Sequence, residues 1–251
     1  MKEDEILKNR FCDLANKAYQ SGQYTFSGFL NMMELDLLIQ SSKDFSYITY
    51  DTFGGSENCE RMMAGFGSSD ILGYEIKFPI TCIRIAPLLK KFSDDFTHRD
   101  FLGALMNLGI ERGTIGDIVV KEKEAYLFCK DSIAEYIIEN LTKVKHTHVK
   151  CSICDNFDQQ IEIHFEGKEL LVSSLRCDVI IAKFYNLSRS QALEIFEQKK
   201  VFVNGKCMEN NSLILKEGDV IAVRGYGKFI YSQFLNETKK GKIMIALQVY
   251  S

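Results

Sequence analysis

The chain has 251 residues, of which 46% are hydrophobic and 12% aromatic, enough to bury sizeable cores in one large domain or in two to three small ones. It contains no run of about 18 apolar residues, so no transmembrane helix is expected. The charged start MKEDEILKNR lacks an apolar signal core, which indicates a cytoplasmic protein. The eight cysteines are scattered, mostly in apolar runs, and are expected to be buried thiols in a reducing compartment.

Charge is distributed unevenly along the chain. Residues 173–251 contain 12 Lys and Arg against 7 Asp and Glu, a net charge of +5, whereas residues 1–172 carry −8 of the total of −3. A basic C-terminal part on an acidic body favours a polyanionic partner for that part. An ordinary solvated surface is an equally good explanation of the charge taken alone.

Residues 1–70 are predicted to form a small α/β unit. Apolar residues at helical spacing predict a helix over residues 2–21, which Gly22 ends. A second helix is expected over roughly residues 28–41, and a strand over residues 45–53.

Residues 71–163 have a clearer order of elements. The pattern predicts a strand in 71–87, a helix over 98–109, a hairpin over 114–130, a helix over 132–141 capped by Asp131 or Ser132, and a strand over 144–153. This β-α-β-β-α-β order is that of the ferredoxin-like arrangement. RNA-recognition modules share it, but so do many proteins that bind no RNA. Tyr126 and Phe128 are the aromatic candidates for stacking bases on the sheet, which is a weak signal.

The C-terminal part, residues 164–251 with a core at 173–230, contains the strongest local signals. Helices are predicted over 173–186 and 187–200, with Ser188 as the N-cap of the second. A strand then leads into an Asn204–Gly205 hairpin turn. A further strand lies within residues 215–229 and ends in a glycine-rich segment.

These signals place cationic and hydroxyl groups where a phosphate can be bound. A helix start exposes unpaired N–H groups and a partial positive charge, which favours a phosphate beside Ser188, Arg189 and Ser190. Each feature alone is explained equally well as a cap, a solvated helix end or a simple turn. Their joint occurrence within 60 residues favours a site for a phosphate backbone, with further cations at Lys199, Lys200, Lys206, Arg224 and Lys228.

The segments SSLRCD, NLSRSQALEIFEQKKVFVNGK and LKEGDVIAVRG resemble an S4-like (alpha-L) RNA-binding domain. The segments HRDFLGALMNLGIERGTIGDIVV, RGYGKF and TKKGKIMIAL resemble the YlmH family. The resemblance implies an α+β protein in three parts: an N-terminal α/β unit (1–70), an RRM-like middle domain (71–163) and an S4-like domain (164–251). Cys177 stands where the S4 module more often has Leu, a conservative change for packing.

The resemblance also implies a function. Family members are similar to bacterial ribosome-associated quality control factors that bind rRNA and tRNA on a large subunit obstructed by peptidyl-tRNA, and an older implied role lies near cell division. Asp178 is then expected to orient Arg176. No cofactor, metal, membrane or DNA partner is expected. The implied RNA-binding residues are Arg176, Ser188, Arg189, Ser190, Gln191, Lys199, Lys200, Asn204, Gly205 and Lys206, with Arg224 and Lys228 as weaker candidates.

Three other interpretations of the sequence compete with this one. His146, His148, Cys151 and Cys154 are potential zinc ligands, but a single Cys-x-x-Cys within an alternating strand pattern argues against a zinc site. S4-like domains also occur in pseudouridine synthases and RNA methyltransferases, yet residues 1–170 have no glycine fingerprint and no clear nucleophile–base set, so no catalytic residues are predicted. An interaction scaffold that uses the acidic body is compatible with RNA binding and stays open.

Overall fold

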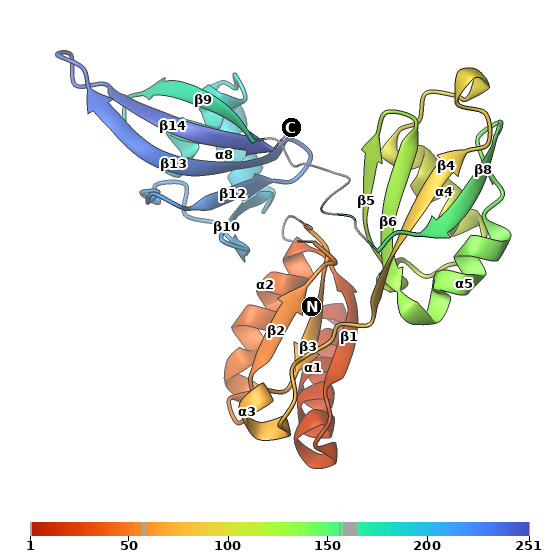
Figure 1. The fold of residues 1–251 in the computed structure, drawn as a ribbon. Coiled ribbons are helices and arrows are strands. Elements are labelled where there is room, and N and C mark those ends of the chain that lie inside the picture. The colour runs from red at the N-terminus through yellow and green to blue at the C-terminus, as the bar shows by residue number, and fades with distance from the viewer. Residues whose placement is uncertain (1, 57–58, 156, 158–164, 251) are drawn as a thin grey trace. The chain divides into compact units, whose positions relative to one another are not determined.

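The computed structural model describes residues 2–56, 59–155, 157 and 165–250 as a mixture of helices and strands (Figure 1). The backbone divides into two compact units, residues 1–161 and 162–251. The α+β fold class predicted from the sequence is confirmed. The predicted boundary between residues 163 and 164 lies outside the described residues.

The first 72 residues form a three-stranded antiparallel sheet, in the order β1-β3-β2, covered by helices. Phe11 and Ala15 from the first helix, Leu38 from the second and Phe66 from the sheet are fully buried in one hydrophobic core. The elements are α1 (Lys2–Ser21), β1 (Thr25–Leu30), α2 (Met32–Ser41), the 3-10 helix η1 (Ser42–Phe45), β2 (Tyr50–Phe53), β3 (Met62–Phe66) and α3 (Ser69–Leu72).

Two predictions in this part were wrong in extent. The segment expected to begin the second helix is a strand, β1, and the helix starts after Asn31. The Asn31 side chain accepts hydrogen bonds from the N–H groups of Met33 and Glu34, and Glu34 accepts one from the N–H of Asn31, a capping box that fixes the start. The strand expected over residues 45–53 is present only at Tyr50–Phe53.

The middle part of the chain has the β-α-β-β-α-β order that the sequence predicts. Its antiparallel sheet has the strand order β5-β6-β4-β8-β7. Both helices pack against one face, where Phe101, Leu105 and Ile137 meet Ile83 and Leu127 in a fully buried core. The elements are β4 (Ile80–Pro87), η2 (Lys90–Phe92), α4 (His98–Asn107), η3 (Arg112–Thr114), β5 (Ile115–Lys121), β6 (Glu124–Lys130), α5 (Asp131–Asn140), β7 (Lys143–Val144) and β8 (Thr147–Ile153).

Two details of this part differ from the prediction. The segment 144–153 is the tight hairpin of β7 and β8, because the backbone turns at Lys145, whose φ is +52°. The N-cap of α5 is Lys130, which makes no side-chain capping bond. The Asp131 side chain instead accepts a hydrogen bond of 2.6 Å from the Thr81 hydroxyl.

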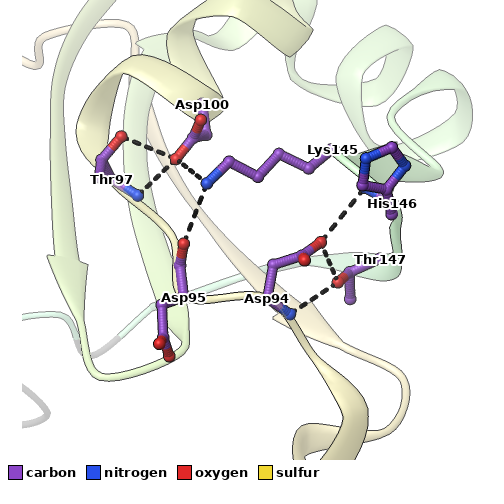
Figure 2. Close-up of polar contacts among 7 residues, drawn as sticks. All are labelled: Asp94, Asp95, Thr97, Asp100, Lys145, His146 and Thr147. Carbon is purple, nitrogen blue, oxygen red and sulfur yellow. Dashed lines mark hydrogen bonds and ion pairs between the residues drawn. The ribbon is translucent and has the colours of Figure 1, made fainter.

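A polar network ties this turn to the start of α4 (Figure 2). The Lys145 ammonium lies 2.9 Å from the Asp100 carboxylate and donates to the Asp95 carbonyl at 3.1 Å. Asp100 also accepts from the N–H and the hydroxyl of Thr97, both at 2.7 Å. These hydrogen bonds from Thr97 and Lys145 lower the pKa of Asp100 to about 2.

Replacing Asp100 by Asn is expected to destabilise the middle part at neutral pH, because Lys145 loses its anionic partner. The pKa of Asp100 is lower in the folded than in the unfolded chain, so its contribution is complete above the ordinary pKa near 4 and is lost as pH falls toward 2. Urea denaturation of both proteins between pH 7 and pH 3 measures this. A stability difference that stays constant over that range contradicts the assignment.

Arg61 holds the loop after β2 against β5. Its guanidinium donates to the carbonyl oxygens of Phe29 at 2.7 Å and of Ile115 and Arg112 at 3.2 Å. The Asp117 carboxylate accepts from the backbone N–H of Arg61 in return. Burial lowers the pKa of Arg61 and raises the pKa of Asp117, and the attraction between the two groups opposes both shifts.

The second unit is a six-stranded antiparallel sheet, in the order β11-β10-β12-β13-β14-β9, with two helices packed against it. Ile180, Ile181, Phe229 and Ile245 are fully buried in its core. The elements are β9 (Phe165–Val172), α7 (Cys177–Phe184), α8 (Arg189–Glu197), β10 (Val201–Val203), β11 (Lys206–Cys207), β12 (Val220–Val223), β13 (Gly227–Glu237) and β14 (Ile243–Tyr250).

Candidate nucleic-acid interface

Helix α8 begins at the predicted N-cap, Ser188. Its hydroxyl accepts a hydrogen bond of 3.2 Å from the N–H of Gln191, and the Gln191 side-chain oxygen accepts one of 2.9 Å from the N–H of Ser188. The Ser190 hydroxyl lies 3.0 Å from that of Ser188. This capping box leaves the side chain of Arg189 exposed beside the positive end of the helix dipole.

Replacing Ser188 by Ala is expected to lower the free energy of unfolding of the second unit by about 1 kcal/mol, because the N–H of Gln191 loses its acceptor. Ser190→Ala is the matched control, since the Ser190 hydroxyl caps no backbone group in the described residues. Urea denaturation followed by circular dichroism compares the two. Equal losses from both substitutions contradict the capping role.

Arg176 precedes α7 and is held in one orientation by Asp178. The guanidinium binds the carboxylate with two hydrogen bonds, Nε to Oδ1 at 3.0 Å and Nη2 to Oδ2 at 2.7 Å. Asp178 is 5% exposed and also accepts from the N–H of Val179 at 2.9 Å. The structure therefore shows the expected pairing, in which the buried carboxylate orients a partly exposed arginine.

A cleft of about 680 Å³ lies between α7 and α8 and brings Arg176 and Arg189 together. Two further groups, Lys183 and Asn186, line the same cleft and are exposed. The sequence-based prediction missed both. Lys183 lies in the last turn of α7 and Asn186 in the short connection to α8, so their position between Arg176 and Arg189 in the sequence was the available signal. Three cations and an amide therefore surround one concavity, a combination that suits a phosphate chain.

The other predicted residues follow α8 in the sequence and lie at its C-terminal end and in or beside two hairpin turns at opposite ends of the β10–β12 pair. The N–H of Arg224 donates to the carbonyl of Lys200 at 2.9 Å, which places the β12–β13 turn beside the helix end. Tyr226 in that turn is 45% exposed, with its ring centre 5.3 Å from that of Tyr185. Prediction from sequence missed Tyr226, an exposed ring that can stack on a base.

Protein contacts occupy two of the predicted side chains in this group. Lys199 forms an ion pair of 2.7 Å with Glu209. The Asn204 amide nitrogen donates to Asp219 at 2.8 Å and its oxygen accepts from the N–H of Val220 at 2.9 Å. With φ values of +50° for Asn204 and +78° for Gly205, the predicted hairpin turn is present. The Asn204 amide therefore fixes the turn, which presents Lys206.

The predicted residues thus form two groups joined by α8. In the first group, Arg176 and Arg189 line the cleft, and Ser188, Ser190 and Gln191 lie at the start of α8. The second group follows α8 and contains Lys199, Lys200, Asn204, Gly205, Lys206, Arg224 and Lys228. The nine residues of α8 separate the two groups by roughly 14 Å at 1.5 Å of rise per residue.

The two aromatic residues predicted from the sequence as candidates for stacking bases on the sheet are buried. Tyr126 and Phe128 are 6% and 1% exposed, and the ring of Phe157 covers both, with centres at 5.6 Å and 4.7 Å. Among the described residues, no group of three or more His, Cys, Asp and Glu side chains has the arrangement of a metal site. Nor, within the part of the chain that the structure describes, is any helix both long and apolar enough to span a membrane.

Two segments of the chain match family models, and a known protein is similar over most of its length. Residues 75–158 match the family model "Putative RNA-binding domain in YlmH", and residues 175–221 match the S4 domain. The Bacillus subtilis (strain 168) protein "Ribosome-associated protein quality control protein P2" is 30% identical over 199 residues, which are 78% of this chain and 76% of that protein. The chain belongs to the YlmH family.

Two further known proteins are similar to parts of this YlmH family member. The small ribosomal subunit protein uS4 of Lachnoclostridium phytofermentans (strain ATCC 700394 / DSM 18823 / ISDg) is 35% identical over 74 residues, 28% of this chain and 37% of that protein. The solved structure "Cell division protein ylmH from Streptococcus pneumoniae" matches with a TM-score of 0.52 and 22% identity, over 64% of this chain and 96% of that one. The second likeness shows a shared fold.

Proposed function

We propose that this YlmH family member is a cytoplasmic, non-enzymatic factor that binds rRNA and tRNA on the large ribosomal subunit. Its task is then the quality control of subunits obstructed by peptidyl-tRNA. The similarity to a ribosome-associated quality control protein of Bacillus subtilis supports the ribosomal partner. The observation that carries the proposal is the cleft between α7 and α8, where an S4 domain presents Arg176, Lys183 and Arg189 around one concavity.

The geometry supports binding to the sugar–phosphate chain. The cations lie at a helix start and along a helix face, where they can approach phosphates, and the carboxylate in the cleft is already neutralised by Arg176. Asp178 is buried and bound at both oxygens, which supports a positioning role for it over a role as a nucleophile. RNA contacts of this kind read the shape of a folded RNA.

Co-sedimentation with ribosomal particles tests the proposal. The protein is expected to travel with large subunits that carry peptidyl-tRNA, and less with empty large subunits, small subunits or 70S particles. Equal binding to small subunits overturns the choice of the large one. Mass mapping of rRNA and tRNA after incubation with the protein tests the non-enzymatic part, since a new pseudouridine or methyl group overturns it.

A further inference from the structure

The middle part of the chain matches a model of an RNA-binding domain, yet the usual binding surface of its fold is closed. Modules with this sheet stack bases on exposed aromatic rings of the central strands. Here Phe157 lies on Tyr126 and Phe128, and a side-chain carbon added at Gly55 would meet the Phe128 ring at 2.2 Å. An RNA contact on this domain therefore requires another surface.

A groove of about 540 Å³ lies along α4 and the segment that follows α5. We call it the α4 groove; its lining includes Arg99, Gly103, Asn107, Asn140, Lys143 and Lys145. Most of these groups are polar, and they come from two segments far apart in the sequence. The groove is thus a concave polar surface built within one domain.

The α4 groove carries an excess of positive charge. Arg99 and Lys143 are exposed, and neither has a hydrogen-bond or ion-pair partner among the described residues. The lining carboxylate, Asp100, is held by Lys145 and Thr97 (Figure 2), so it neutralises Lys145 rather than the other two cations. Residues 1–172 carry a net charge of −8, so this cationic groove differs in sign from the part of the chain in which it lies.

Gly103 leaves the floor of the groove open. It lies inside α4, where glycine costs about 1 kcal/mol relative to alanine. Nothing lies within 4 Å of a side-chain carbon added there, and its φ is not positive, so neither crowding nor the backbone requires glycine. Arg99, Gly103 and Asn107 lie at i, i+4 and i+8 on one face of the helix. The missing side chain lets a ligand approach the helix backbone between Arg99 and Asn107.

We propose that the α4 groove is a second RNA-binding site, which takes a sugar–phosphate backbone. Arg99 and Lys143 would bind phosphates, and the amides of Asn107 and Asn140 would bind phosphate oxygens or ribose hydroxyls, the groups that side chains meet on folded RNA. An RNA occupant is favoured because the groove is cationic and lies within the segment that matches an RNA-binding domain. This site deepens the proposed function but lies in a different unit from the α7–α8 cleft.

The test measures the affinity of the full chain for large-subunit rRNA as a function of salt. Arg99→Ala with Lys143→Ala is expected to weaken binding by about 10-fold and to reduce the salt slope by between 1 and 2, at about 0.7–0.9 for each lost phosphate contact. Gly103→Gln should weaken binding at unchanged charge, whereas Gly103→Ala should leave it unchanged and stabilise the helix. Lys17→Ala with Lys43→Ala, two exposed cations elsewhere in the first unit, is the matched control for charge.

The binding measurements can contradict the α4 groove and the α7–α8 cleft independently of each other. If the Arg99 and Lys143 variant binds with the affinity and salt slope of the Lys17 and Lys43 control, the α4 groove is not an RNA site, whatever the cleft does. If substitutions in the α7–α8 cleft have no effect while those in the groove weaken binding, the groove is supported and the cleft is overturned. Circular dichroism confirms that each variant is folded.

Discussion

Replacing Lys183 and Arg189 together by Ala is expected to weaken binding to large-subunit rRNA by about 10- to 100-fold at physiological salt, with the fold intact. Both side chains are exposed in the α7–α8 cleft, so their removal leaves no cavity and no buried group without a partner. The salt slope should fall by between 1 and 2, because each phosphate contact contributes about 0.7–0.9. Filter binding or anisotropy across a salt series measures both quantities.

Lys239→Ala with Lys240→Ala is the matched control for this result. It removes the same charge from the same unit, at the exposed turn between β13 and β14. If general electrostatic attraction accounts for binding, the two variants lose affinity equally. A control variant that loses as much as the cleft variant therefore contradicts a specific site between α7 and α8.

Replacing Phe229 by Ala is expected to lower the free energy of unfolding of the second unit by about 3–5 kcal/mol. Phe229 is fully buried, and its ring packs 4.6 Å from that of Phe184 at the end of α7 and 6.1 Å from that of Tyr185. The substitution leaves a cavity beneath the helix that lines the cleft, so RNA binding should fall together with stability. Thermal unfolding combined with RNA binding on the full chain measures this.

Phe229→Leu is the conservative counterpart, because it keeps most of the buried volume and should cost less than about 1.5 kcal/mol. The unfolding of the first unit should be unchanged in both variants, since its two cores share no residue with that of the second unit. If the full chain unfolds in one thermal transition, and Phe229→Ala shifts that whole transition, the prediction that the two units unfold independently is contradicted. RNA binding at the affinity of the unsubstituted chain, in a Phe229→Ala protein whose second unit is unfolded, would contradict the need for a formed cleft.

Local signals in the sequence were sufficient for much of this fold. The N-cap at Ser188 and the turn at Asn204–Gly205 were predicted, because each depends on hydrogen bonds or φ values within a few residues. The α1 helix and the β5–β6 hairpin were predicted for the same reason, from apolar spacing along one element. The start of α2 was missed because TFSGFL is equally compatible with a helix until its pairing with β3 is known.

The candidate site depends more on contacts between distant segments. Lys183 and Asn186 become part of it only because α7 packs beside α8, and Tyr226 because a turn 40 residues further on reaches Tyr185. Likewise, Phe157 covers Tyr126 and Phe128 from outside the strands that carry them. The sequence indicated which residue types were present, whereas tertiary packing decides which of them share a surface.

Photo-crosslinking from position 183 tests the central claim, that the α7–α8 cleft binds the backbone of ribosomal RNA. Lys183 is exposed and helical, so a photoreactive amino acid can replace it without strain, and position 239 serves as the reference. Sequencing of the captured RNA should return large-subunit rRNA or tRNA from position 183 and little from position 239. Equal capture from the two positions, or capture of protein alone from position 183, would contradict the claim.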